Sequence, residues 1–228
     1  GLVLNTIGME RAIAAKVDEV NFVLPATDAF AQANQNTTVQ ALLDQLGVVS
    51  EMAVGERIPL TVTVAVAFGC PYQGAVSENA ALDVARHALD RADVAELAFA
   101  DTIGCAGPWQ SGSLFARAAG LTDTPLRAHF HETRHTALAN VYAAISSGVS
   151  RFDSSVGGLG GCPFAPGAAG NVATEDLAWM LSNAGFVHGV SVEDAAATGA
   201  AICDALGVLP RSGIAAAGQF PPMIASPN

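Results

Sequence analysis

The sequence predicts an α/β protein built on a parallel sheet, and three observations carry that prediction. Hydrophobic residues make up 51% of the 228-residue chain, so a large core can be buried. Short runs of β-forming residues alternate with longer alanine-rich segments of helical period, which is the pattern of repeated βα units. Most of the short runs are apolar on both faces, as strands inside a parallel sheet should be.

Six βα units are expected, and together they would form a single domain over residues 1–228. Ser77 is expected to cap a helix that runs to Arg91, and Thr174 to cap another, because a hydroxyl can accept a hydrogen bond from a free N–H of the first turn. Two alanine-rich helices should follow the sixth strand. The six strands are predicted at Leu2–Asn5, Glu19–Leu24, Pro59–Ala67, Val94–Ala100, Leu126–His131 and Arg151–Ser155.

Six parallel strands fit two architectures. One is an open, doubly wound sheet, although the GxGxxG turn typical of that fold does not follow the first predicted strand. The other is a closed eight-stranded barrel of which two strands are absent from this sequence. Composition and alternation alone do not decide between them.

Charge and hydropathy exclude several classes of function. The formal net charge is −11, and the ten basic residues are scattered without a run, so a nucleic-acid partner is not expected. The longest apolar stretches, such as Ile58–Phe68, are shorter than the roughly 20 residues that a membrane-spanning helix needs. The amino-terminal segment lacks the basic start and apolar core of a secretion signal. Neither a membrane nor a secreted location is expected.

The cysteines favour a reducing compartment. They lie far apart and form no CxxC pair, so neither a structural zinc site nor a disulfide framework is expected. A cytoplasmic location fits this spacing best. The four cysteines are Cys70, Cys105, Cys162 and Cys203.

Two histidines stand two residues apart at the end of the fifth predicted strand. Because side chains alternate along a strand, His129 and His131 should share one face at its carboxyl end. Two neutral imidazoles that converge there can bind a divalent cation. The alternative is a pair of hydrogen-bonded core histidines. His135 should lie at the rim of the following helix.

A glycine-rich loop follows the sixth predicted strand, with six glycines between Val156 and Gly170. At the carboxyl end of a barrel strand, such a loop can close over a substrate and bring Cys162 to it, while Asn171 offers an amide oxygen to a metal. The alternative is a structural turn whose cysteine is buried and inert. The glycines expected to form the substrate loop are Gly158, Gly160 and Gly161.

A third candidate is Asp101, at the point where the fourth predicted strand becomes a loop. A carboxylate at this end of a barrel strand can take part in catalysis. The alternative is that Asp101 caps the turn that follows it, which the sequence Asp-Thr-Ile-Gly favours equally. Cys70, which follows the third predicted strand in a similar Gly-Cys-Pro context, is expected to be structural.

Taken together, these motifs resemble the hydroxymethylglutaryl-CoA lyases in their order and spacing, over nearly the whole chain. The last of them is highly specific. The resemblance implies a (β/α)8 TIM barrel, of which this chain supplies about strands three to eight and the carboxyl-terminal helices, without the first two βα units. The runs that carry it are Phe68–Tyr72, Asp101–Gly104, His129–His131 and Asp153–Asp176.

The resemblance also implies roles for single residues. His129, His131 and Asn171 would be ligands of a divalent metal, Mg or Mn. Cys162 would be the catalytic cysteine of the flexible loop, and Asp101 an active-site acid. The family's fourth ligand, an aspartate after the first strand, and the catalytic arginine before it have no counterpart in this sequence. Glu132 and His135 depart from the usual His-Asp-Thr-x-Gly, which leaves the substrate preference open.

The function implied is metal-dependent cleavage of 3-hydroxy-3-methylglutaryl-CoA to acetyl-CoA and acetoacetate. Two alternatives stay open: a paralogous lyase or aldol-type synthase for another branched hydroxyacyl-CoA or keto acid, and an inactive truncated barrel. An acyl-CoA is the expected partner, and the chain is expected to form a homo-oligomer, a dimer. Without the first two units, the chain is expected to be a poor lyase with exposed strand edges.

Overall fold

The structure is a computed structural model that describes residues 1–161 and 170–218. Its contacts divide the described chain into two compact units. The first unit comprises residues 1–153 and holds the parallel sheet, and the second comprises residues 154–161 and 170–218 and is largely helical. The expectation of a single domain over residues 1–228 therefore stays a prediction.

The first unit is built on a six-stranded sheet whose strands are all parallel and adjacent in chain order. This is the succession of βα units that the sequence predicts, and each predicted strand has its counterpart. The observed strands are one to three residues shorter or shifted at their ends. They are β1 (Leu2–Val3), β2 (Val20–Pro25), β3 (Leu60–Ala65), β6 (Glu96–Asp101), β7 (Leu126–Phe130) and β8 (Arg151–Asp153).

The predicted third strand ends early because its backbone turns at Val66. That residue has a φ of 50°, in the left-handed region that a β-branched side chain rarely enters. The Val66 N–H donates to the hydroxyl of Thr102 at 2.9 Å, which ties this turn to the neighbouring loop. A short antiparallel hairpin follows, formed by β4 (Gly69–Cys70) and β5 (Gly74–Ala75). Cys70 is buried there and accepts a hydrogen bond from Thr27, as a structural cysteine would.

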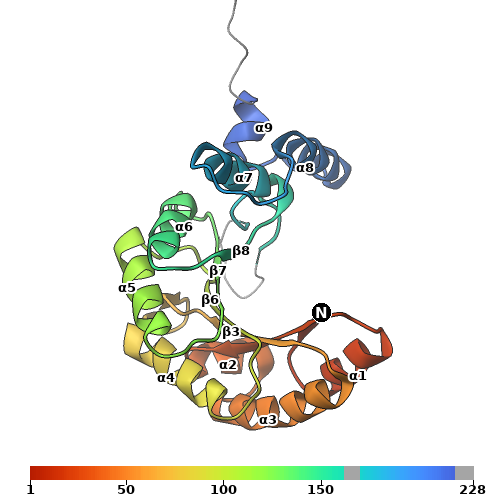
Figure 1. Cartoon of the computed structure of the whole chain (residues 1–228), viewed down its shortest axis with the longest axis vertical. Helices are drawn as coiled ribbons and strands as arrows, with labels where there is room; N and C mark the ends of the chain where they lie inside the picture. Colours follow the sequence, from red (N-terminus) through yellow and green to blue (C-terminus); the bar gives the residue numbers. More distant parts are fainter. Residues whose placement is uncertain (162–169, 219–228) are drawn as a thin grey trace, which may run out of the picture. The chain divides into compact units, whose positions relative to one another are not determined.

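Helices connect the strands and pack on one face of the sheet (Figure 1). Ser77 caps α4 as predicted, with its hydroxyl accepting from the Ala80 N–H at 3.2 Å, and the helix ends two residues before Arg91. The helices of this unit are α1 (Thr6–Ala14), α2 (Asp28–Gln35), α3 (Val39–Glu56), α4 (Glu78–Leu89), α5 (Pro108–Ala119) and α6 (Ala137–Ser146).

The core lies between the sheet and these helices. Phe99 of β6 meets Phe115 of α5 edge to face, with ring centroids 5.8 Å apart, and Phe115 meets Phe130 of β7 in the same way at 6.2 Å. Such contacts favour one arrangement of strand and helix over others. Residues that alternate with these on the strands therefore point to the other face of the sheet.

That other face is more polar than expected. The sequence predicted strands that are mostly apolar on both faces, and on this face that was wrong for β3 and β7, while β2 and β6 each carry one polar residue there. Charged and hydroxyl side chains are accommodated because they pair with one another; Thr61 donates to Glu19, and Thr63 to Asn21, each at 2.9 Å. The polar residues of this face are Asn21, Thr61, Thr63, Glu96, Arg127 and His129.

The second unit begins with a single 3-10 turn, η1 (Val156–Gly158), and continues with three helices. Thr174 is the first residue of its helix rather than the cap, because its hydroxyl bonds Ser154 at 2.9 Å instead of a free N–H. The helices are α7 (Thr174–Asn183), α8 (Val192–Leu206) and α9 (Gly213–Ala217), of which the last two are the alanine-rich helices predicted for the tail. Among the helices of the described residues, none is long and apolar enough to span a membrane.

Candidate functional site

The two histidines of the predicted pair face each other at the carboxyl end of β7. Their ring centroids are 5.2 Å apart, and their Nε2 atoms are 3.1 Å apart. His131 is buried, whereas the side chain of His129 keeps 27% of its exposure. His129 lies in register with Ala100 of β6, whose small side chain leaves room for the imidazole. The shared face that the two-residue spacing predicts is therefore present.

His129 is oriented by a carboxylate from the next strand. Its Nδ1 lies 3.1 Å from Oδ2 of Asp153, the residue in register with it on β8. Because a carboxylate accepts hydrogen bonds, this contact is a hydrogen bond when the ring proton is on Nδ1. In that tautomer the lone pair of Nε2 is directed toward His131.

Asp153 belongs to a chain of ion pairs that crosses the polar face of the sheet. Arg127 contacts Oδ1 of Asp153 at 3.5 Å and Oε1 of Glu19 at 3.4 Å, and its Nε pairs with Glu96. Arg151 pairs with the other oxygen of Glu96. Sequence reasoning missed this chain, although Arg127 has the same alternating spacing as the two histidines.

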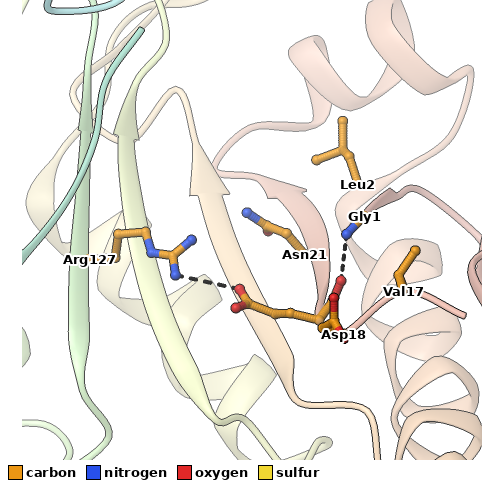
Figure 2. A pocket seen from close by; sticks show the side chains of 7 residues that line it. Gly1, Leu2, Val17, Asp18, Asn21 and Arg127 are labelled. Atoms are coloured by element: carbon orange, nitrogen blue, oxygen red, sulfur yellow. Dashed lines mark hydrogen bonds and ion pairs between the residues drawn. The ribbon is translucent and has the colours of Figure 1, made fainter. Parts of the chain in front are cut away.

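A cavity of about 600 Å³ opens at the amino end of the same strands (Figure 2). Arg127 and Glu19 both line it, and their side chains form an ion pair at 3.4 Å. The histidines do not line it, since they lie at the opposite ends of the strands. The cavity and the histidine pair are therefore two separate sites. The ion-pair chain connects them, because Arg127 lines the cavity and also contacts Asp153. Its other lining residues are Gly1, Leu2, Val17, Asp18 and Asn21.

Asp101 lies on the opposite face of the sheet from the histidines, because its neighbour Ala100 is the residue in register with His129. Its two oxygens accept from the N–H groups of Cys105 and Ala106, each at 2.9 Å, so the carboxylate shapes the loop after β6. Burial raises the pKa of Asp101, and the two backbone hydrogen bonds oppose that effect. Burial, followed by the charge of Asp101, raises the pKa of the Cys105 thiol to about 12.

The loops after β6 and β7 are locked together beside His131. Arg134 donates to the carbonyl oxygens of Ile103 and Gly104 at 2.9 and 2.8 Å. A methyl group on Gly104 would stand 2.8 Å from the carbonyl oxygen of His131, closer than real Cβ contacts allow. The position of His131 thus depends on a glycine in the neighbouring loop.

Two departures from the family pattern have structural consequences. Glu132 reaches the start of α6, where its Oε2 accepts from the Ala137 N–H at 3.1 Å. His135 stands where the family has glycine, and it keeps the left-handed conformation with a φ of 56°. Its side chain is 93% exposed. The loop after the histidine pair therefore carries an additional ring at the rim of this unit.

In the second unit, the described part of the glycine-rich loop is held at its base by Glu175. Both oxygens of this buried carboxylate accept from the Gly157 N–H at 3.1 Å. Gly158 and Gly160 have φ values of 63° and 105°, so the backbone there favours glycine. Gly161 has open space around its α-carbon. Of the three predicted loop glycines, two are thus required by the conformation of the loop itself.

Asn171 lies directly after this loop. Its Nδ2 donates to the carbonyl of Leu159 at 3.0 Å, which fixes the orientation of the amide. Its Oδ1 is buried and has no hydrogen-bond partner among the described residues. Such an acceptor is costly unless it meets a donor or a cation.

The donor set of this chain fits a divalent cation in part. Two Nε2 atoms 3.1 Å apart can both reach one ion at a usual metal–nitrogen distance of about 2.1 Å. The described residues hold no cluster of three or more His, Cys, Asp or Glu with metal-binding geometry. Asn171 belongs to the second unit, and its approach to the histidines stays a prediction. Cys162 lies outside the described residues.

Three comparisons with known proteins agree. The HMGL-like family model matches residues 3–202. Hydroxymethylglutaryl-CoA lyase of Pseudomonas mevalonii is 41% identical over 212 residues, which are 92% of this chain and 70% of that protein. (R)-citramalyl-CoA lyase of Chloroflexus aurantiacus is 38% identical over 196 residues, which are 84% of this chain and 60% of that protein.

The solved structures include an HMG-CoA lyase from Acinetobacter baumannii in complex with coenzyme A and 3-methylmalate. It superimposes with a TM-score of 0.92 at 34% identity and covers 98% of this chain and 74% of that one. Across eight curated lyases, the present chain spans 60% to 70% of their length.

The α/β fold of these lyases, expected from the sequence, is confirmed, while the barrel strands to which the six observed ones correspond stay a prediction. The expectation of a lyase is confirmed at the level of the family. By its motifs, its fold and its relatives, this chain belongs to the HMGL-like family.

Proposed function

We propose that this chain forms the metal-binding part of a carbon–carbon lyase that cleaves 3-hydroxy-3-methylglutaryl-CoA to acetyl-CoA and acetoacetate. The observation that carries the proposal is the convergence of His129 and His131, with Asp153 orienting the first of them, in a member of this family. The acyl-CoA substrate is supported by the coenzyme A bound to a structural relative.

A divalent cation, Mg or Mn, would be held by the Nε2 atoms of His129 and His131 and by Oδ1 of Asn171. When bound, it would lower the pKa of the substrate hydroxyl and fix its geometry. The buried Oδ1 of Asn171, without a hydrogen-bond partner among the described residues, supports its place in this set.

The reaction is a retro-aldol cleavage. A base takes the proton of the tertiary hydroxyl, the electrons of that O–H bond form the carbonyl of acetoacetate, and the carbon–carbon bond breaks. Its electron pair passes to the thioester, and protonation of the resulting enolate gives acetyl-CoA. Polar groups that meet this developing charge supply much of the catalysis.

Several residues of this chain have proposed parts in those steps. Cys162 would close the loop over the substrate or return the proton, and the loop glycines Gly158, Gly160 and Gly161 would let it approach. Asp101 directs both of its oxygens into its own loop, which supports a positioning role rather than direct proton transfer.

A second candidate substrate is another branched 3-hydroxyacyl-CoA, such as citramalyl-CoA. The specific observation is the altered loop after the histidine pair, where Glu132 caps α6 and His135 stands exposed in place of glycine. A relative that is named for citramalyl-CoA is only slightly less similar than one named for hydroxymethylglutaryl-CoA.

A cytoplasmic location and a homodimer also stay predictions.

The test is an assay of this chain, and of a version extended upstream by about two βα units, with both thioesters and Mg or Mn. Release of acetyl-CoA and acetoacetate from hydroxymethylglutaryl-CoA is the expected result, with the greater turnover in the extended version. Preference for citramalyl-CoA would favour the second candidate. Turnover that EDTA does not lower in either version would contradict the metal site.

A further inference from the structure

We propose that Asp153 is a positioning residue that fixes the tautomer and ring orientation of His129, and that Arg127 holds Asp153 in place for this task. The inference deepens the proposed function and rests on it, since the oriented nitrogen is one of the proposed metal ligands. Asp153 itself would touch neither metal nor substrate.

The first step is the contact between Asp153 and His129. The two residues are in register on adjacent parallel strands, and Oδ2 lies 3.1 Å from Nδ1. With the proton on Nδ1, this contact is a hydrogen bond. With the proton on Nε2, two acceptors would face each other at the same distance, which costs free energy. The carboxylate therefore favours the tautomer whose Nε2 lone pair faces His131.

The second step is the clamp on Asp153. Its other oxygen, Oδ1, lies 3.5 Å from the guanidinium of Arg127, so the carboxylate is held from two sides. Arg127 is held in turn by Glu19 at 3.4 Å and by Glu96, whose side chain is only 6% exposed. A planar guanidinium holds its five N–H donors in fixed directions, so Arg127 can contact three carboxylates with a defined geometry that a flexible lysine does not impose.

The third step is the balance of charge. Arg127 and Arg151 are in register on β7 and β8, and two like charges at such positions repel. Glu96 binds both and offsets the repulsion. Two guanidinium groups and the three carboxylates of Glu19, Glu96 and Asp153 give the ion-pair chain a formal net charge of −1, and Asp153 is the carboxylate that contacts His129. A negative charge at this position favours a cation at the Nε2 atoms.

The experiment compares the wild-type chain with Asp153→Asn and with Asp83→Asn. Asp83 also pairs with an arginine, but on the exposed surface of α4, so its variant controls for the loss of one carboxylate. Ring 15N spectra of the metal-free proteins report the tautomer of His129 among five histidines. Titration calorimetry with Mn²⁺ alone reports the affinity.

We expect wild type and Asp83→Asn to carry the proton on Nδ1 of His129 and to bind Mn²⁺ alike. Asp153→Asn should show a mixture of tautomers, because an amide can accept from or donate to the ring, and should bind Mn²⁺ about 10- to 100-fold more weakly. Arg127→Lys keeps the positive charge but loses the planar guanidinium with its fixed N–H donors. Its affinity for Mn²⁺ is therefore expected to lie between those of wild type and Asp153→Asn.

The outcomes separate this inference from the proposed function. If wild type binds no Mn²⁺, the metal site is wrong, but the spectra still decide the positioning role through the tautomer of His129. If Asp153→Asn keeps the wild-type tautomer and affinity, the positioning role is overturned while the metal site stands. An unchanged affinity in Arg127→Lys would overturn the part assigned to Arg127.

Discussion

The Nε2 atoms of His129 and His131 lie 3.1 Å apart at the carboxyl end of β7. Two residues separated by one position on a strand share a face, but their rings need not converge. Here the rings converge. Asp153 contacts Nδ1 of the His129 ring, and the Nε2 atom of that ring faces His131. Both Nε2 atoms are thus placed where one ion can reach them, and a fixed orientation of the ligands strengthens metal binding.

Replacing one member of the pair should therefore abolish most metal binding. His131→Ala is expected to weaken Mn²⁺ binding by at least 100-fold, because the remaining imidazole cannot hold the ion alone. His87→Ala is the matched control, since that histidine is exposed on α4. Titration calorimetry measures both. Equal affinities in the two variants would show that the ion binds elsewhere.

Gly104 controls the position of His131 from the neighbouring loop. Gly104→Ala should lower the free energy of unfolding by about 1–3 kcal/mol, because its φ is +56° and its new methyl group would stand 2.5 Å from the Thr133 hydroxyl. Since the methyl group also approaches the His131 carbonyl at 2.8 Å, Mn²⁺ affinity should fall as well.

Gly55→Ala provides the control, because nothing lies within 4 Å of its added methyl group on α3. That substitution should stabilise the protein by about 0.5–1 kcal/mol through helix propensity, without any change in Mn²⁺ affinity. Urea unfolding and calorimetry give both quantities. A Gly104→Ala variant as stable as wild type would contradict the close packing of the two loops.

The sequence predicts the six strands because short β-forming runs alternate with helical segments along the chain. Their observed order, each strand beside the next in the chain, is the order of the barrel that the family resemblance implies, and alternation of segments alone did not predict it. The shared face of His129 and His131 follows from the alternation of side chains along a strand. The ion-pair chain through Arg127 and Glu96 could not be predicted, because its partners are brought together by the register of different strands. The turn at Val66 was missed for a similar reason, since the hydroxyl of Thr102 stabilises it from another loop.

Gly160 and Gly161 of the second unit differ in whether their positions can accept a larger residue. Gly160→Ala should destabilise the protein by about 1–3 kcal/mol, because its φ is +105° and its methyl group would stand 2.5 Å from Nδ2 of Asn171. Displacing that amide should also weaken Mn²⁺ binding if Asn171 is a ligand. Gly161→Ala is the neighbouring control, with nothing within 4 Å of its methyl group. Comparable losses in both variants would contradict this distinction.

Asp101 makes stability depend on pH in a direction that burial fixes. Its pKa in the folded protein is raised above the ordinary 3.8, so the folded state holds the proton more tightly than the unfolded state. Its contribution is therefore fully present below pH 3.8 and is lost as the pH rises through the raised pKa. Each pKa unit corresponds to about 1.4 kcal/mol.

Asp101→Asn should remove this dependence. An amide does not titrate, so the stability of wild type relative to the variant should fall as the pH rises from about 4 and then level off above the folded pKa. The variant also leaves one of the Cys105 and Ala106 N–H groups without an acceptor, which lowers its free energy of unfolding by about 1–3 kcal/mol at every pH. This loss shifts the plot of relative stability against pH by a constant and leaves its slope unchanged. Urea unfolding between about pH 4 and pH 8 measures the difference. A relative stability of wild type that rises with pH would mean that the two backbone hydrogen bonds outweigh burial, and that Asp101 is held as a carboxylate.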